Sequence, residues 1–226
     1  MTVPEKAWLE RLKEHGYYAV SFELRGGRPT NLIQLREWMS TDRPRHTGWS
    51  PFWWPTRPEI APRTIDQATY ECVHAGSNMT GRVERWRAST EGIFTIVRDY
   101  DSDREFEPGL FLELTLPVWR VGELLLYAGR MALRFEAETI DFMLRYEGLA
   151  GRTLSTRASA NRILLEEYTT HGDKYEKRVE LKAADVDSGI VEMTDELVRG
   201  LYAMFQFELP AALCEEEIGR MRTGRF

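Results

Sequence analysis

Five of the ten prolines in this 226-residue chain lie in one segment, residues 43–65, which reads RPRHTGWSPFWWPTRPEIAPRTI. Proline fixes φ and lacks a backbone N–H, so neither a helix nor an inner strand can run through such a segment. Three of the seven tryptophans lie there too, and this aromatic content argues against disorder. The segment therefore predicts a long irregular loop, of a length typical of functional loops.

The composition of the whole chain is that of a globular protein. Hydrophobic residues make up 42% and charged residues 29%, which excludes the disordered and fibrous classes. No apolar run approaches the roughly 20 residues that span a bilayer, and the N-terminus is charged from Glu5 onward, unlike a secretory signal. Two cysteines, Cys72 and Cys214, are too few for a disulfide framework. We expect a cytoplasmic protein with no membrane partner.

Hydrophobic periodicity predicts a mixture of strands and helices. Period-two alternation indicates strands at residues 17–24, 82–89, 93–99, 110–114, 139–146, 163–168 and 175–181. Helical spacing indicates helices at residues 2–16, 31–39, 116–135 and 194–205, with Thr194 as a cap, and a last helix opening at Pro210. Because the strands and helices do not alternate strictly, the pattern favours an α+β fold, a mainly antiparallel sheet with helices packed on it. No repeat or linker divides residues 1–226, which predicts a single compact domain.

Most catalytic signatures are absent from the chain. It has no Walker loop, GxGxxG, HExxH, CxxC or GxSxG motif. No two of the four histidines have the i, i+4 spacing of a zinc site. Asp99, Asp101 and Asp103 begin like a calcium loop, but Arg104 and Leu110 stand where that loop needs glycine and a carboxylate. We therefore predict a protein that is not an enzyme and has no catalytic residue, metal site or cofactor.

One weaker alternative keeps a catalytic role. Glu180-Leu181-Lys182 closes a predicted strand with the E-x-K pattern of metal-dependent nucleases, in which carboxylates hold Mg²⁺ and a lysine steadies the attacking water. Alternating charge on the wet face of an edge strand explains the same residues.

The loop at residues 43–65 has the chemistry of a ligand site. It contains four arginines and one acidic residue, Glu59, a local charge of +3 in a chain of net charge −6. Aromatic rings stack on bases and guanidinium groups bind phosphates, which suits a nucleotide or another phosphate-bearing ligand. The overall negative charge makes nucleic acid a less favoured partner. The alternative is that the tryptophans fold inward and fix the loop. The candidate ligand residues in the loop are Arg45, His46, Trp49, Trp53, Trp54, Arg57 and Arg63.

Arg152 is a further candidate ligand residue. It follows a turn with glycines at Gly148 and Gly151, a type of turn that can form an anion-binding concavity. A guanidinium directed into that space would give a second phosphate contact. The alternative is a surface ion pair with a carboxylate such as Glu147.

Several segments, taken in order, resemble a known family. GYYAVSFELR, LREWM, HTGWSPFWWPTRPEI, VERWRASTEGIFTIVRDY, LTLPVWRVGELLLYAGRMA and YEGLAGRTL are similar to a C-terminal module of bacterial proteins. In those proteins, which include ATP-binding and helix-turn-helix regulators, the module follows a Schlafen/AlbA-2-type putative DNA-binding domain. The similarity extends over residues 17–220, and the AlbA-like domain itself has no counterpart here. The resemblance implies an accessory module that works with an effector domain, and it carries over no catalytic residue.

These observations predict a non-enzymatic sensing or binding module of a bacterial regulatory or antiphage-defence system. Its expected ligand is a nucleotide or another small phosphorylated molecule. The alternative is a protein–protein interaction module, in which exposed tryptophan and phenylalanine side chains of the loop anchor an effector partner.

Overall fold

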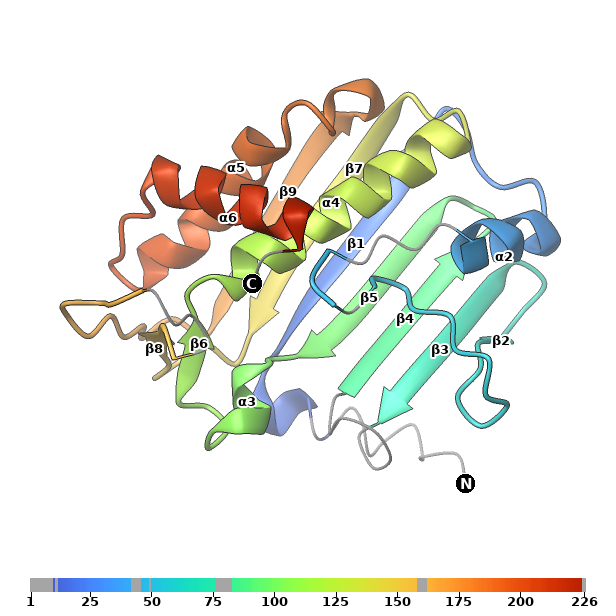
Figure 1. Ribbon diagram of the computed structural model, residues 1–226. Helices are drawn as coiled ribbons and strands as arrows, with labels where there is room; N and C mark the ends of the chain where they lie inside the picture. The colour runs from blue at the N-terminus through green and yellow to red at the C-terminus, as the bar shows by residue number, and fades with distance from the viewer. Residues whose placement is uncertain are drawn as a thin grey trace.

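A computed structural model describes residue 10 and residues 12–41, 46–48, 50–75, 83–157 and 162–224. Its centre is a seven-stranded sheet in which every neighbouring pair is antiparallel, confirming the α+β prediction (Figure 1). In spatial order the strands are β2 (Arg63–Thr64), β3 (Thr69–Ala75), β4 (Val83–Ser89), β5 (Ile93–Asp99), β1 (Tyr17–Arg25), β7 (Thr139–Glu147) and β9 (Lys174–Lys182). A separate parallel pair joins β6 (Phe111–Glu113) to β8 (Thr153–Ser155).

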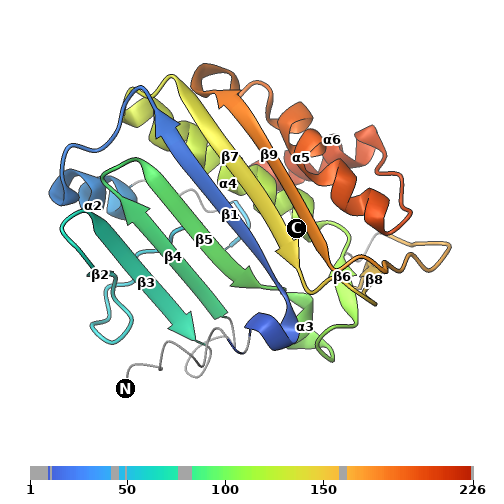
Figure 2. The same cartoon turned by 180° about the vertical axis from the view of Figure 1, so that it is seen from behind.

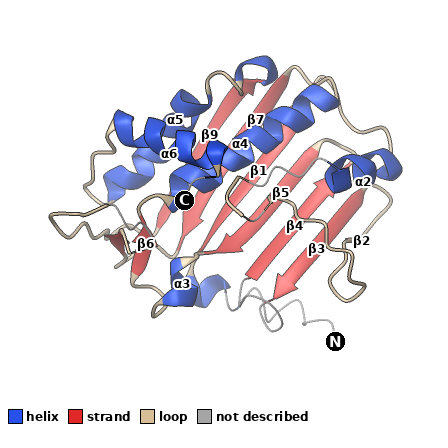
Figure 3. Ribbon diagram, in the orientation of Figure 1, coloured by secondary structure: helices blue, strands red, loops and turns tan. Residues whose placement is uncertain are grey.

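The long helices lie on one face of this sheet (Figure 3). Helix α4 (Leu116–Arg134) contacts β1 and β7, and α5 (Ile190–Met204) contacts β9. Helix α6 (Ala211–Thr223) packs on α4 and α5, while α2 (Leu32–Thr41) contacts β4. The short α3 (Ser102–Glu105) follows β5, and a 3₁₀ turn, η1 (Ala183–Asp185), follows β9. None of the helices in the described ranges is long and apolar enough to cross a membrane.

The opposite face of the sheet is largely open (Figure 2). In β1, for example, the side chains of Tyr18, Val20 and Phe22 are buried under the helices, whereas the alternate residues point to the other face. That face carries ion pairs between neighbouring strands, such as Arg85–Glu71, Arg178–Asp141 and Arg145–Glu176. Among the described residues, the N-terminal turn covers only one end of it, where Leu12 packs with Val83, Tyr17, Val73 and Val97.

Three expectations about the elements are wrong. Residues 163–168 form an irregular segment, not a strand, and Ile163 and Leu165 are 85% and 94% exposed. Residues 69–75, which the periodicity did not single out, form β3. Helix α5 begins at Ile190, so Thr194 lies inside it, fully buried, instead of capping it. The predicted first helix lies mostly outside the described residues, which include a helical stretch at residues 12–15.

Two glycines allow the start of β1 to approach the end of β7. Gly16 and Gly148 both have positive φ, at 80° and 74°. A Cβ atom added to Gly148 would lie 2.5 Å from the Cα atom of Gly16. The backbones are therefore too close for any side chain at this crossing.

We predict that Gly148→Ala lowers the free energy of unfolding more than Gly151→Ala. Both positions have positive φ, so both substitutions carry a left-handed cost of about 1–2 kcal/mol. Only at Gly148 does the added methyl group collide with backbone, since no atom lies within 4 Å of a Cβ at Gly151. The collision should add about 1–3 kcal/mol, measurable by urea denaturation. Equal losses in the two variants would contradict the close approach.

Candidate functional site

The proline-rich loop lies across the core face of the sheet. Its described residues, 46–48 and 50–62, pass over β5, β4 and β3 on the same side as the helices (Figure 1). Phe52, with φ of 51°, is 1% exposed, and its ring lies 4.9 Å from that of Tyr127 and 6.0 Å from that of Trp86. Trp54 is 8% exposed, with its ring 5.0 Å from that of Tyr70. The inward interpretation therefore holds for Phe52 and Trp54, and Trp54 cannot stack on a ligand without leaving the core.

Buried charged groups hold the backbone of this loop. The Glu123 carboxylate of α4 accepts hydrogen bonds from the N–H groups of His46 at 2.8 Å and Thr47 at 3.1 Å. Arg98 of β5 donates to the carbonyl of Ser50 at 3.3 Å. Further along, the indole N–H of Trp86 donates to the carbonyl of Trp53 at 3.0 Å. An irregular buried segment needs such partners because its backbone polar groups have no ladder of their own.

The Arg98 guanidinium keeps its charge in this buried place. Burial alone would lower its pKa, but the charge of Glu84, whose carboxylate lies 2.5 Å away, and the hydroxyl of Tyr18 raise it above the ordinary value. The side chains of Arg98 and Glu84 are almost fully buried, at 2% and 0% exposure. Removing one of them would leave an uncompensated charge beneath the loop.

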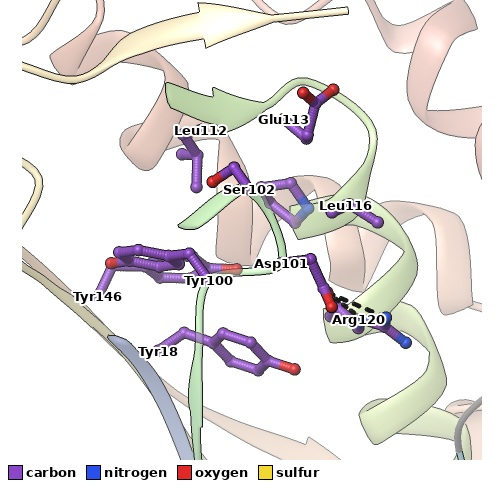
Figure 4. A pocket seen from close by; sticks show the side chains of 10 residues that line it. Tyr18, Tyr100, Asp101, Ser102, Leu112, Glu113, Leu116, Arg120 and Tyr146 are labelled. Carbon is purple, nitrogen blue, oxygen red and sulfur yellow. Dashed lines mark hydrogen bonds and ion pairs between the residues drawn. The ribbon is translucent and has the colours of Figure 1, made fainter. Parts of the chain in front are cut away.

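A small pocket lies beside the loop, between α4 and the ends of β1, β5 and β7 (Figure 4). Three tyrosines line it, and the rings of Tyr18 and Tyr100 lie 5.7 Å and 5.9 Å from that of Tyr146. Burial raises the pKa of Tyr100 and Tyr146 well above the ordinary value, so both hydroxyls stay protonated. The pocket has a volume of about 20 Å³, which accommodates roughly one water molecule. It is too small for a nucleotide in this conformation.

One guanidinium joins the tyrosine pocket to the loop. Arg120 of α4 donates to the carboxylate of Asp101 at 3.0 Å and to the hydroxyl of Thr47 at 2.5 Å (Figure 4 shows the contact with Asp101). Its side chain is 7% exposed, and burial is the main cause that lowers its pKa. The pocket thus belongs to the polar network that fixes the loop.

One accessible part of the loop is at its far end. Trp53 is half-buried, and its ring stacks on that of His74 in β3, with centroids 5.0 Å apart and planes 27° apart. Arg57 and Arg63 are exposed on the same segment. Arg63 is opposite Glu71 in the β2–β3 register, so its side chain starts on the face of the sheet opposite to His74, at the edge of the sheet. We call Trp53, Arg57, Arg63 and His74 the Trp53 corner.

Among the other candidate residues of the loop that the structure describes, His46 does not join this corner. The backbone of His46 faces α4 through its hydrogen bond to Glu123. Arg45 and Trp49 lie outside the described residues. The sequence prediction singled out Trp53, Arg57 and Arg63 but not His74, whose contact with Trp53 depends on the pairing of distant segments.

The structure corrects the prediction for Arg152. Its side chain is fully buried, and Asp103 accepts from both terminal nitrogens at 2.6 Å and 2.7 Å. The carbonyls of Gly148 and Phe111 accept at 2.7 Å each, and the carbonyl of His15 accepts the fifth hydrogen bond. All five donors are engaged within the protein, so none is left for a phosphate. The partner is the buried Asp103, not a surface carboxylate such as Glu147.

The residues of the nuclease alternative lie on the open face. Glu180 and Lys182 are exposed on β9, and Glu180 is opposite Asp141 of β7. The Asp141 carboxylate is bound by Arg25 at 3.0 Å and also contacts Arg178. Within the described ranges, no group of three or more histidine, cysteine, aspartate or glutamate side chains is arranged to hold a metal ion.

Comparison of the chain with family models, curated proteins and solved structures gave no match. The resemblance to the module that follows Schlafen/AlbA-2-type domains therefore stays a prediction. The functional argument depends on the geometry of the Trp53 corner.

We predict that Arg152→Met lowers the free energy of unfolding by about 3–5 kcal/mol, because it leaves the buried Asp103 carboxylate without its partner. Arg145→Met, which removes an arginine on the open face whose side chain is 39% exposed, is the control and should have little effect. Chemical denaturation of both variants measures the difference. Similar stabilities for the two variants would contradict the buried structural role of Arg152.

Proposed function

We propose that this chain is a non-enzymatic binding module that recognises a phosphate-bearing ligand, such as a nucleotide, at the Trp53 corner. The observation that supports this most is the half-buried Trp53 with the exposed arginines Arg57 and Arg63 on the same segment. An indole face can stack on a base, and guanidinium groups bind phosphate through paired charged hydrogen bonds.

The support beneath the corner favours binding. The backbone of Trp53 is fixed by the indole N–H of Trp86, and its ring is held on His74. The neighbouring Trp54 is fixed in the core. A ligand would therefore meet a ring whose position is already set, which lowers the entropy that binding must overcome.

The family resemblance adds a context to this proposal. It implies that the module works with an effector domain in bacterial regulation or antiphage defence. In that context the bound nucleotide would be the signal, and the loop that crosses the core face would connect the Trp53 corner to α4 through Thr47, Glu123 and Arg120.

We predict that a nucleotide raises the thermal stability of the protein, by about 2.7 kcal/mol at a hundredfold excess over Kd. A thermal-shift screen against mononucleotides and cyclic oligonucleotides measures this effect. The double variant Arg57→Ala/Arg63→Ala should lose about tenfold or more in affinity, because charge-assisted hydrogen bonds to phosphate are lost. Arg28→Ala, an exposed arginine elsewhere on the surface, is the matched control and should bind normally.

Two results would refute the proposal. The first is a complete screen in which no nucleotide shifts the melting curve. The second is a nucleotide whose affinity is unchanged in the double variant, which would place the binding site elsewhere.

A second candidate function is docking of an effector protein, and a different observation favours it. The sequence prediction placed the anchors in the loop, but Phe52 and Trp54 are buried. Instead, Ile163 and Leu165 are 85% and 94% exposed on one segment before β9, and exposed apolar surface can mark an interaction site.

We predict for this candidate that Ile163→Ser/Leu165→Ser weakens binding to an AlbA-like domain supplied as a separate chain, the partner that the resemblance suggests. The thermal stability should not change, because these side chains are exposed. Ile33→Ser, at an isoleucine of α2 that is 79% exposed, is the control. Titration calorimetry measures the affinities. Equal binding by the unmodified protein, the double variant and the control variant would exclude this surface.

A further inference from the structure

A thiol and an imidazole meet on the core face of β3 under the Trp53 corner. Cys72 and His74 are two residues apart in the strand, so both side chains point to the same face. The Cys72 sulfur lies 3.2 Å from Nε2 of His74. We propose that this pair is a site of covalent modification, at which Cys72 adds to a small α,β-unsaturated carbonyl compound when the segment above it lifts. The inference does not require the nucleotide of the proposed function.

The geometry is that of a thiol with its own base. A nucleophilic side chain is activated when a base lies within hydrogen-bonding reach and a third group orients that base. Here the indole of Trp53 stacks on the imidazole of His74. On the neighbouring strand, Glu84 is directly opposite His74 in the β3–β4 register.

Residues 55–62, next to the ring of Trp53, close this site from above. Cys72 is 2% exposed, and its thiol donates to the carbonyl of Ile60 at 3.4 Å. The same segment contains three prolines, which have no N–H to donate to the sheet, and residues 56–59 of its turn are exposed. Lifting residues 55–62, while Trp54 stays in the core, would break the hydrogen bond from Cys72 to Ile60 and expose the thiol beside the ring of Trp53. Local openings of this kind need far less free energy than global unfolding.

The closed state keeps the pair unreactive. Burial raises the pKa of the Cys72 thiol, the charges of Glu84 and Glu71 raise it further, and Arg63 lowers it. Burial also lowers the pKa of His74, with Arg98 acting in the same direction and Glu84 against it. A neutral thiol thus faces a neutral imidazole. Opening admits water and removes the largest of these causes, and the imidazole is then ready to accept the thiol proton.

The reaction balances without an oxidant or a leaving group. The Cys72 sulfur forms a bond to the β-carbon of the electrophile while the C=C π bond breaks. Nε2 of His74 takes the thiol proton, and a proton is returned to the α-carbon. The product is a thioether, and His74 ends neutral as it began.

The chain contains its own control cysteine. Cys214 of α6 is fully buried, and its sulfur lies 3.7 Å from the carbonyl of Val191 in α5. Burial raises the pKa of this thiol to about 12. Cys214 is covered by packed helices and not by a proline-rich segment, so its labelling reports the general opening of the protein.

The test uses N-ethylmaleimide on the whole folded protein without nucleotide, followed by peptide mass spectrometry. We expect Cys72 to be modified at least about tenfold faster than Cys214. Trp53→Ala should raise the rate at which Cys72 is modified and leave the rate for Cys214 unchanged. His74→Gln should slow the modification of Cys72 by about tenfold, because the proton acceptor is lost while the segment above still opens. Trp38→Ala, at a half-buried tryptophan of α2 whose ring packs at a tilt against that of Phe135, is the matched control for general destabilisation.

Three outcomes would overturn the proposal. One is equal labelling of Cys72 and Cys214 in the unmodified protein. Another is a Trp38→Ala variant in which the modification of Cys72 is accelerated as much as in Trp53→Ala. The third is a His74→Gln variant whose Cys72 reacts at the original rate. If Trp53→Ala does not fold, the comparison of the unmodified protein with His74→Gln decides, because both proteins keep the segment above Cys72 unchanged.

Discussion

The width of the sheet determines how the rest of the molecule is built. Seven strands place the outer strand axes about 29 Å apart, whereas a helix with its side chains is about 10–12 Å across. Helices α4 and α5 cover β1, β7 and β9, and α2 reaches β4. The remaining core face, over β5, β4 and β3, is covered by the proline-rich loop. Phe52 and Trp54 therefore supply apolar surface that a further helix would otherwise provide.

A core that is covered by an irregular loop buries the polar backbone groups of that loop, which then need hydrogen-bond partners. This need explains why charged side chains are buried beneath the loop. Glu123, Arg98 and the indole of Trp86 satisfy the backbone of the loop at successive points. Arg120 connects the same network to Asp101 and the tyrosine pocket. The loop is thus fixed at its start and middle, while its far end carries the accessible arginines Arg57 and Arg63 and the cover over Cys72.

The sequence predicts the elements whose periodicity is strong. The strands at β1 and β7 and the helix α4 were placed to within a residue or so at each end. Strand β3 was missed because both of its faces mix polar and apolar residues, with Cys72 and His74 on the core side. Within the loop, no local pattern separates the buried Trp54 from the half-buried Trp53. The left-handed backbone at Phe52 and the packing on the sheet decide which ring turns inward. Arg152 was misplaced because its partner, Asp103, is 49 residues away in the chain.

The charges along β9 have a consequence for how two copies of this molecule can meet. Strand β9 is an edge of the sheet, and an edge strand is a template for addition of another strand. Its exposed positions read lysine, glutamate, arginine, glutamate, lysine, which is the same sequence in both directions. Antiparallel pairing with a second β9 over its full length would set Lys174 against Lys182, Glu176 against Glu180 and Arg178 against itself. Like charges would then oppose one another at every exposed position, so the palindrome disfavours fusion of two sheets into one continuous ribbon.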